Sequence, residues 1–237
     1  MIPFVSLDMF YIAAAVLPAA VLMVLTYRLD RAEPEPSSLL AKMVLMGCVA
    51  VIPAIVLEIG VQDFLLPLFS YDNYTQYYII LALTVGLIEE GCKFFFLYRS
   101  TWNDPNFNYV FDGVIYAVYV SLGFAALENI EYVFQYGLSV ALTRAFLAVP
   151  GHFAFSVFMG AWYGSAKVQE VRGNHGAKIT RMILAYLSAV AVHTMYDALA
   201  MIGTDRATIL FFLFVMVMYV VVYRKVKAES AGDRFIY

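Results

Sequence analysis

The chain has 237 residues, of which 63% are apolar and only 14% are charged. Soluble domains are about half apolar and about a quarter charged, so this composition indicates an integral membrane protein. The net charge of −3 and the lack of a long basic run argue against nucleic acid as the main partner. Cys48 and Cys92 lie in different apolar segments and form no CxxC pair, which argues against a disulfide framework or a cysteine-based zinc site.

Windows of about 20 apolar residues predict an all-α bundle of about seven transmembrane helices, forming one integral-membrane domain over residues 1–237. In chain order, the predicted spans cover residues 4–27, 39–61, 77–98, 111–134, 141–163, 181–202 and 206–223. The first span is not preceded by the basic residues that open a secretory signal peptide. We therefore expect it to be retained as a transmembrane helix.

The distribution of basic residues predicts which ends of the spans face the cytoplasm. Alternate connections and the tail carry them: Arg28, Arg31 and Lys42, then Arg99, then Lys167, Arg172, Lys178 and Arg181, and finally Arg224, Lys225, Lys227 and Arg234. The other connections are nearly bare, with only Arg144 and Arg206 at their edges. Because positive charge stays on the cytoplasmic side, we expect the amino terminus outside and the carboxyl terminus inside, as an odd number of spans requires.

The third span contains three ionisable residues, Glu89, Glu90 and Lys93, in the otherwise apolar sequence LTVGLIEEGCKFFFLY. Each such residue costs about 2.5–3.5 kcal/mol in the middle of a membrane helix, so the cluster predicts a buried site that water can reach. Glu89 and Glu90 point about 100° apart around the helix, while Lys93 is within reach of both. We expect one glutamate to pair with Lys93 and the other to face a cavity.

Two histidines on other spans are predicted to lie at the depth of this cluster. At a rise of about 1.5 Å per residue, Glu89 lies ~18 Å, His152 ~16 Å and His193 ~14 Å from the outer end of its span. Three residues of functional type, from three different helices, are therefore expected near one level of a hydrocarbon core that is about 30 Å thick.

Further polar residues are predicted closer to the outer face, at ~8–9 Å: Glu128 and Asn129 on the fourth span and Asp197 on the sixth. His193 and Asp197 are four residues apart and share a helix face. Together with the deeper cluster, these residues predict a polar column through which water enters from the outside.

A carboxylate and a histidine around a water molecule can take its proton, drive its attack on a carbonyl, and return the proton to the leaving amine. The nucleophile motif GxSxG and the zinc motif HExxH are both absent. A divalent metal such as zinc remains possible, and its candidate ligands are Glu89, His152, His193 and Asp197. The residues alone also leave open a transporter or proton relay, a zinc-dependent membrane hydrolase acting on lipids, and a scaffold without catalysis.

Four separated blocks resemble the PrsW family of bacterial membrane proteases: IEEGCKFF, FDGVIYAVYVSLGFAALENIEY, VPGHFAFSVFMGAWYG and VHTMYDAL. The D-x-x-EP element from Asp30 to Pro34 also fits, so that the resemblance covers about residues 27–200. It implies an intramembrane endopeptidase of the bacterial cell (inner) membrane. Such an enzyme makes the first (site-1) cut in a membrane-anchored regulatory protein such as an anti-sigma factor.

The resemblance extends to the wider clan of the type II CAAX prenyl endopeptidases and their bacterial relatives. Its signature implies Glu89 as the general base acting with His152 on water, Glu90 as the supporting glutamate, and His193 with Asp197 as the pair that stabilises the oxyanion. The resemblance does not decide between zinc and a purely glutamate-based mechanism.

This chain departs from the clan pattern at two of these positions. This chain has Lys93 three positions after Glu90, whereas the prenyl enzymes have an arginine one position further along. Asp197 occupies a position at which asparagine is commoner. As a carboxylate, Asp197 also suits orienting His193 or binding metal. Glu128 and Asn129 resemble a feature of the PrsW family and are expected to support the site, as is Lys93.

Overall fold

The structure is a computed structural model that describes residues 7–68, 70–71 and 73–237. Its elements in chain order are α1 (Leu7–Tyr27), α2 (Ser37–Gly60), α3 (Tyr74–Thr101), α4 (Asp112–Tyr136), α5 (Leu138–Phe146), α6 (Ala148–Val171), α7 (His175–Met201) and α8 (Asp205–Ala231). A π-helical turn (Val61–Leu65) and a 3-10 turn (Leu66–Leu68) extend α2 into the predicted 62–76 loop. No strand occurs in this part of the chain, which confirms the predicted all-α class. Residues 4–6 of the first predicted span lie outside the described residues.

Within the described ranges, six helical segments are long and apolar enough to cross a membrane, and the chain is a multi-pass membrane protein. They are Asp8–Tyr27, Ser37–Leu68, Asp112–Tyr136, Leu138–Val171, His175–Met201 and Asp205–Ala231. The remaining long helix, α3, contains the charged cluster, but its 28 residues extend about 42 Å, which exceeds the hydrocarbon thickness. Helix α3 packs along α2 and α7, and its crossing of the membrane as a seventh span stays a prediction. The predicted orientation of the termini stays a prediction.

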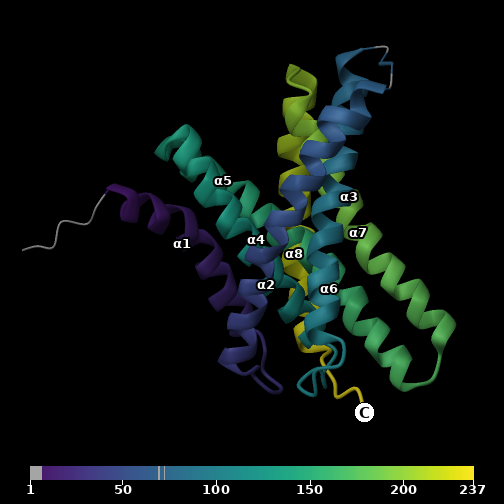
Figure 1. The fold of residues 1–237 in the computed structure, drawn as a ribbon. Coiled ribbons are helices and arrows are strands. Elements are labelled where there is room, and N and C mark those ends of the chain that lie inside the picture. The colour runs from purple at the N-terminus through teal and green to yellow at the C-terminus, as the bar shows by residue number, and fades with distance from the viewer. Residues whose placement is uncertain (1–6, 69, 72) are drawn as a thin grey trace, which may run out of the picture.

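Helix α4 lies in the middle of the bundle, where it packs against α1, α2 and α6 (Figure 1). Small residues allow this close packing. A Cβ atom on Gly160 of α6 would lie 2.5 Å from the Cα of Val114 on α4, and a Cβ on Gly47 of α2 would lie 1.9 Å from the carbonyl oxygen of Val120. Only glycine fits at either position, so α2 and α6 approach the backbone of α4 directly.

The outer faces of the bundle expose large apolar side chains. Leu17 on α1, Val56 on α2 and Met216 on α8 are each more than 60% exposed. A soluble protein rarely exposes so many residues of this kind on so many helices, whereas lipid covers them at no cost. Hydrophobic side chains therefore mark the lipid-facing surface, and polar side chains inside the bundle must find partners there.

The predicted span at 141–163 is divided in the structure. The short helix α5 ends at Phe146, Leu147 has φ −116° and ψ −63°, and α6 then begins at Ala148. Pro150 lies in the first turn of α6, where its missing backbone N–H has no helical partner to lose. The break lets α5 turn away from the direction of α6 and lie beside α4 and α1 (Figure 1).

Candidate functional site

The ammonium group of Lys93 lies at the centre of the buried polar residues. Its Nζ atom is 2.9 Å from Oε2 of Glu89, 2.8 Å from Oε1 of Glu90 and 3.0 Å from Nδ1 of His152. The sequence predicted that Lys93 would pair with one glutamate, but in the structure it pairs with both. All four residues are buried, so this cation compensates two carboxylates that water does not solvate.

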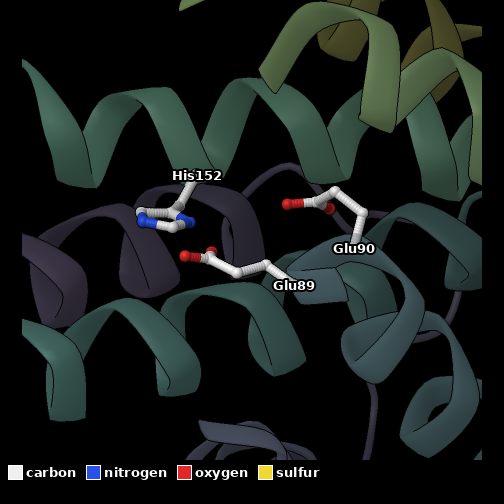
Figure 2. A group of neighbouring side chains, drawn as sticks. All are labelled: Glu89, Glu90 and His152. Atoms are coloured by element: carbon white, nitrogen blue, oxygen red, sulfur yellow. The ribbon is translucent and has the colours of Figure 1, made fainter. Parts of the chain in front are cut away.

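The carboxyl groups of Glu89 and Glu90 and the ring of His152 point toward a common space between α3 and α6 (Figure 2). Glu90 is fully buried, whereas Glu89 also lines a cavity. The different surroundings follow from the 100° turn between adjacent helical residues, which directs Glu90 toward α7 and leaves Glu89 at the cavity wall. Of the two adjacent glutamates, Glu89 is therefore the one that a water molecule in the cavity can reach.

His152 is held at both ring nitrogens. Its Nδ1 atom faces Lys93, and its Nε2 atom is 3.0 Å from Oε2 of Glu128 on α4. Because an ammonium group can only donate, Nδ1 accepts and the proton of the neutral ring is placed on Nε2, from where it is donated to Glu128. The side chain of Phe124 also lies beside the ring, with centroids 5.9 Å apart. Contacts on three sides therefore fix the orientation of the imidazole.

His193 lies between two carboxylates on different helices. Its Nδ1 atom is 2.9 Å from Oε1 of Glu90, and its Nε2 atom is 3.2 Å from Oδ2 of Asp197. Ionised carboxylates only accept hydrogen bonds, so both contacts are satisfied when both ring nitrogens carry protons. Phe155 stacks on the ring with a centroid distance of 4.5 Å. His152 and His193 are themselves neighbours, with centroids 5.7 Å apart.

Sequence reasoning missed Arg144, which it placed at the edge of a connection. Arg144 lies on α5, where its guanidinium group is 2.8 Å from Oε2 of Glu128 and 3.9 Å from the ring centre of Tyr132. It also donates from Nε to Oδ1 of Asn129. Asn129 in turn donates to the carbonyl oxygen of Ala15 and connects α1 to α4. Asn129 thus supports Arg144 and does not line the cavity.

A cavity of about 430 Å³ opens beside these residues. Its ionisable lining comes from five long helices and α5, and includes Glu58, Glu89, Glu128, Glu131, Arg144, His152, His193 and Asp197. Glu58 and Glu131 lie near the expected outer ends of their spans, and both face the cavity. A water molecule occupies about 30 Å³ in the liquid, so the cavity holds several waters or a short peptide segment. The ionisable side chains therefore surround a cavity that has room for water or substrate within the membrane domain.

The donor atoms of Glu89, Glu90 and His152 lie within 4.8 Å of one another, and among the described residues only this trio forms such a potential metal group. His193 and Asp197, which the sequence suggested as further ligands, are not part of it. The trio does not fit a metal as it stands, because Lys93 Nζ already lies 2.8–3.0 Å from an atom of each residue. Zinc at about 2.0–2.2 Å from the same atoms would coincide with the ammonium group and repel it.

The chain matches the model of the PrsW family intramembrane metalloproteases over residues 35–223. It is 31% identical over 224 residues to a protein named Protease PrsW from Geobacillus kaustophilus, covering 94% of this chain and 93% of the relative. The corresponding protein of Halalkalibacterium halodurans is 30% identical over 223 residues, covering 94% and 98%. That of Bacillus subtilis is 28% identical over 187 residues, covering 78% and 80%. No solved structure matches the chain significantly.

Proposed function

Since the chain belongs to the PrsW family of intramembrane metalloproteases, we propose that it makes the first cut in a membrane-anchored regulatory protein such as an anti-sigma factor. Membership of this family makes the chain a membrane protease, and a membrane protein is accordingly its substrate. The choice of an anti-sigma factor rests on the resemblance of the sequence motifs. We place the protein in the bacterial inner membrane on the same basis.

The observation that carries the proposed mechanism is the position of Glu89, which contacts Lys93 and also lines the cavity beside His152. A water molecule between Glu89 and His152 gives a proton to the Glu89 carboxylate while its oxygen attacks the carbonyl carbon of the substrate. Glu89 then passes that proton to the nitrogen of the leaving amine as the C–N bond breaks. This cycle is general base catalysis followed by general acid catalysis by a single carboxyl group.

The neighbouring residues support this cycle by fixing charge and direction. Lys93 holds the carboxylates of Glu89 and Glu90 in place, and Glu128 holds the tautomer of His152. His193 lines the cavity and carries a positive charge when both ring nitrogens are protonated, and this charge stabilises the negative oxygen that develops on the substrate carbonyl. Its two N–H groups remain on Glu90 and Asp197. In this scheme Asp197 orients His193 and does not itself contact the oxyanion.

A metal is implied by the description of the family but is not used in this mechanism. The reason is the contact geometry of Lys93, whose ammonium group lies among the three donors that a metal would need. If a metal were bound to Glu89, Glu90 and His152, it would supply Lewis-acid activation of water. Lys93 would then have to leave its position between the carboxylates.

Co-expression with an epitope-tagged, membrane-anchored anti-sigma factor of the host bacterium tests the proposal. The wild-type protein should produce a truncated fragment, and Glu89→Ala and His152→Ala should abolish it while the protein still accumulates. Glu229→Gln on α8 is a suitable control, because this carboxylate pairs with Lys225 far along the chain from the site. Retained cleavage in both site variants would remove these residues from the mechanism. Loss of anti-sigma cleavage with retained cleavage of another membrane protein would correct the substrate alone.

A further inference from the structure

A second group of carboxyl groups, three buried and one partly buried, lies away from the cavity, at the end of the molecule that carries the C-terminus (Figure 1). Asp30 and Glu35 belong to the connection between α1 and α2, Asp112 is the first residue of α4, and Asp233 follows α8. We call these four residues the carboxyl cluster. Asp112 is separated from Glu128 by 16 positions, or about 24 Å along α4. The cluster is therefore distinct from the candidate active site.

Each carboxyl group of the cluster uses only one of its two oxygen atoms. Asp30 accepts from the Glu35 N–H (3.3 Å), and Glu35 accepts from the Tyr116 hydroxyl (2.6 Å). Asp112 accepts from the N–H groups of Asn108 and Tyr109 (3.0 and 2.6 Å). Asp233 accepts from the N–H groups of Phe111 and Arg234 (2.8 and 2.9 Å). The other oxygen of each group is buried and has no partner. Asp30, Glu35 and Asp112 are at most 5% exposed. An unpaired oxygen in such a place is costly for an ionised carboxylate.

No lysine or arginine forms an ion pair with these carboxyl groups in the part of the chain that the structure describes. The groups that act on them electrostatically are mostly acidic: Glu33 and Asp104 from the two loops, the Tyr116 phenol, and the cluster members themselves, with Arg234 beside Asp233. Like charges at short range disfavour ionisation of all four. The cluster therefore requires either bound protons or a bound cation.

The geometry favours a proton. Glu35 and Asp112 are neighbouring carboxyl groups that act on each other, and each has one buried oxygen without a partner. Two ionised carboxylates cannot form a hydrogen bond with each other, because both only accept, whereas one proton shared between them makes that bond. A divalent cation requires several oxygens that converge on one point. Within the described chain, no three of the cluster's carboxyl groups bring oxygen atoms within 4.8 Å of one another.

We propose that the carboxyl cluster is a proton-binding site in which Glu35 and Asp112 share one proton. The bound proton holds together the α1–α2 connection, the start of α4 and the C-terminal tail, and we call this three-part contact the clamp. The tail is held beside the start of α4 by hydrogen bonds from Val110 N–H to Arg234 and from Ile236 N–H to Asn108. Release of the proton leaves facing negative charges and loosens this clamp. The proposal is independent of the proposed proteolytic activity.

The surroundings of the cluster place proton binding in a useful pH range. Burial raises the pKa of Glu35 to about 7, against the opposing hydrogen bond from Tyr116 and together with the charge of Asp30. Burial likewise raises the pKa of Asp30 to about 6. Because these folded-state values exceed those of the unfolded chain, the folded protein binds more protons, and stability falls as pH rises from about 4.5 to about 7. The clamp is closed in acid and loosens near neutral pH.

The test uses the full-length protein in detergent and compares it with Glu35→Gln. Glutamine still accepts from Tyr116 and can donate to Asp112, so it imitates the shared proton permanently. We expect the decrease in Tm between pH 5 and pH 8 to be reduced in Glu35→Gln. We also expect the infrared carbonyl band of a protonated carboxyl group, present at pH 6, to lose intensity in this variant. The control is Glu229→Gln on α8, a carboxylate that pairs with Lys225 and not with the cluster, which should retain both signals.

Asp112→Asn provides a second variant if Glu35→Gln does not accumulate, because asparagine retains an oxygen for the amides of Asn108 and Tyr109. It should show the same reduced pH dependence and the same loss of the infrared band. An unchanged pH dependence of Tm in the variants would overturn the proposal. So would a saturable rise in wild-type Tm with Mg²⁺ or Ca²⁺ at pH 8 that is reversed by chelator and absent from Glu35→Gln, which would show a cation site.

Discussion

Lys93 Nζ on α3 lies 3.0 Å from Nδ1 of His152 on α6, and this contact determines which ring nitrogen of His152 carries the proton. The ammonium group has no acceptor, so His152 must direct its proton away from Lys93 and toward Glu128. The same ammonium group binds both adjacent glutamates of α3. Lys93 thus fixes the tautomer of His152 and also holds the carboxylate of Glu89, which we assign as the base.

Replacement of Lys93 with methionine should abolish cleavage and destabilise the protein. Without the ammonium group, the buried carboxylates of the consecutive residues Glu89 and Glu90 lose their shared counter-ion, and breaking such a buried pair costs about 3–5 kcal/mol. Thermal unfolding in detergent measures the stability, and cleavage of the co-expressed substrate measures the activity. A methionine variant with normal Tm and normal cleavage would show that Lys93 does not hold the glutamates.

Glu128 should contribute to activity through His152 and not through the substrate. Glu128→Leu removes the acceptor that fixes the imidazole tautomer, and a hydrogen bond to a charged group is worth about 1.5–3 kcal/mol. We expect cleavage to slow by about tenfold to about 100-fold in reconstituted vesicles. Glu128→Gln retains an acceptor oxygen for Nε2 and should recover part of that loss. Equal rates for the leucine and glutamine variants would contradict a tautomer-holding role.

The approach of α6 to α4 should be intolerant of any side chain at Gly160. An alanine Cβ there would lie 2.5 Å from the Cα of Val114, so the two backbones must separate, and overpacking of this kind costs about 1–3 kcal/mol. Gly176→Ala is the matched control, since a Cβ at that position of α7 meets nothing within 4 Å. Gly160→Ala should lower Tm, and Gly176→Ala should leave it unchanged or raise it. The reverse order of the two Tm values would refute the observed helix contact.

Chelation should leave the cleavage rate unchanged. Because the ammonium group of Lys93 lies among the donors of Glu89, Glu90 and His152, the proposed mechanism requires no metal at that place. Purified protein dialysed against EDTA should retain its rate, and metal analysis should find no stoichiometric zinc. Loss of cleavage in EDTA, restored by one equivalent of zinc, would show that Lys93 moves aside and that the metalloprotease description applies.

The parts of the site that could be predicted from the sequence are those in which charge lies within an apolar helix. Glu89, Glu90 and Lys93 are conspicuous because an ionisable residue in a membrane span is rare, and helix rise alone places His152 and His193 near the same depth. The structure brings these five residues into contact. Their catalytic roles stay predictions, because contact geometry alone does not show which group moves a proton.

Other parts of the structure depend on long-range packing that no local pattern records. Arg144 resembled a charge at the end of a loop, and only the break at Leu147 lets α5 bring it to Glu128. The carboxyl cluster was hidden for a similar reason. Glu35 and Asp112 are separated by more than 70 positions and resemble solvated charges at helix ends, so their burial became visible only with the fold.

The role of Glu89 as the general base is tested most directly by the cleavage rate of purified Glu89→Gln in proteoliposomes that contain a tagged, membrane-anchored anti-sigma factor. Glutamine preserves the size of the side chain and an acceptor for Lys93 but cannot take a proton from water. We expect a rate at least about 100-fold below wild type, the usual contribution of a general base, with an unchanged Tm. Cleavage by Glu89→Gln at the wild-type rate would contradict the role of Glu89 as the base.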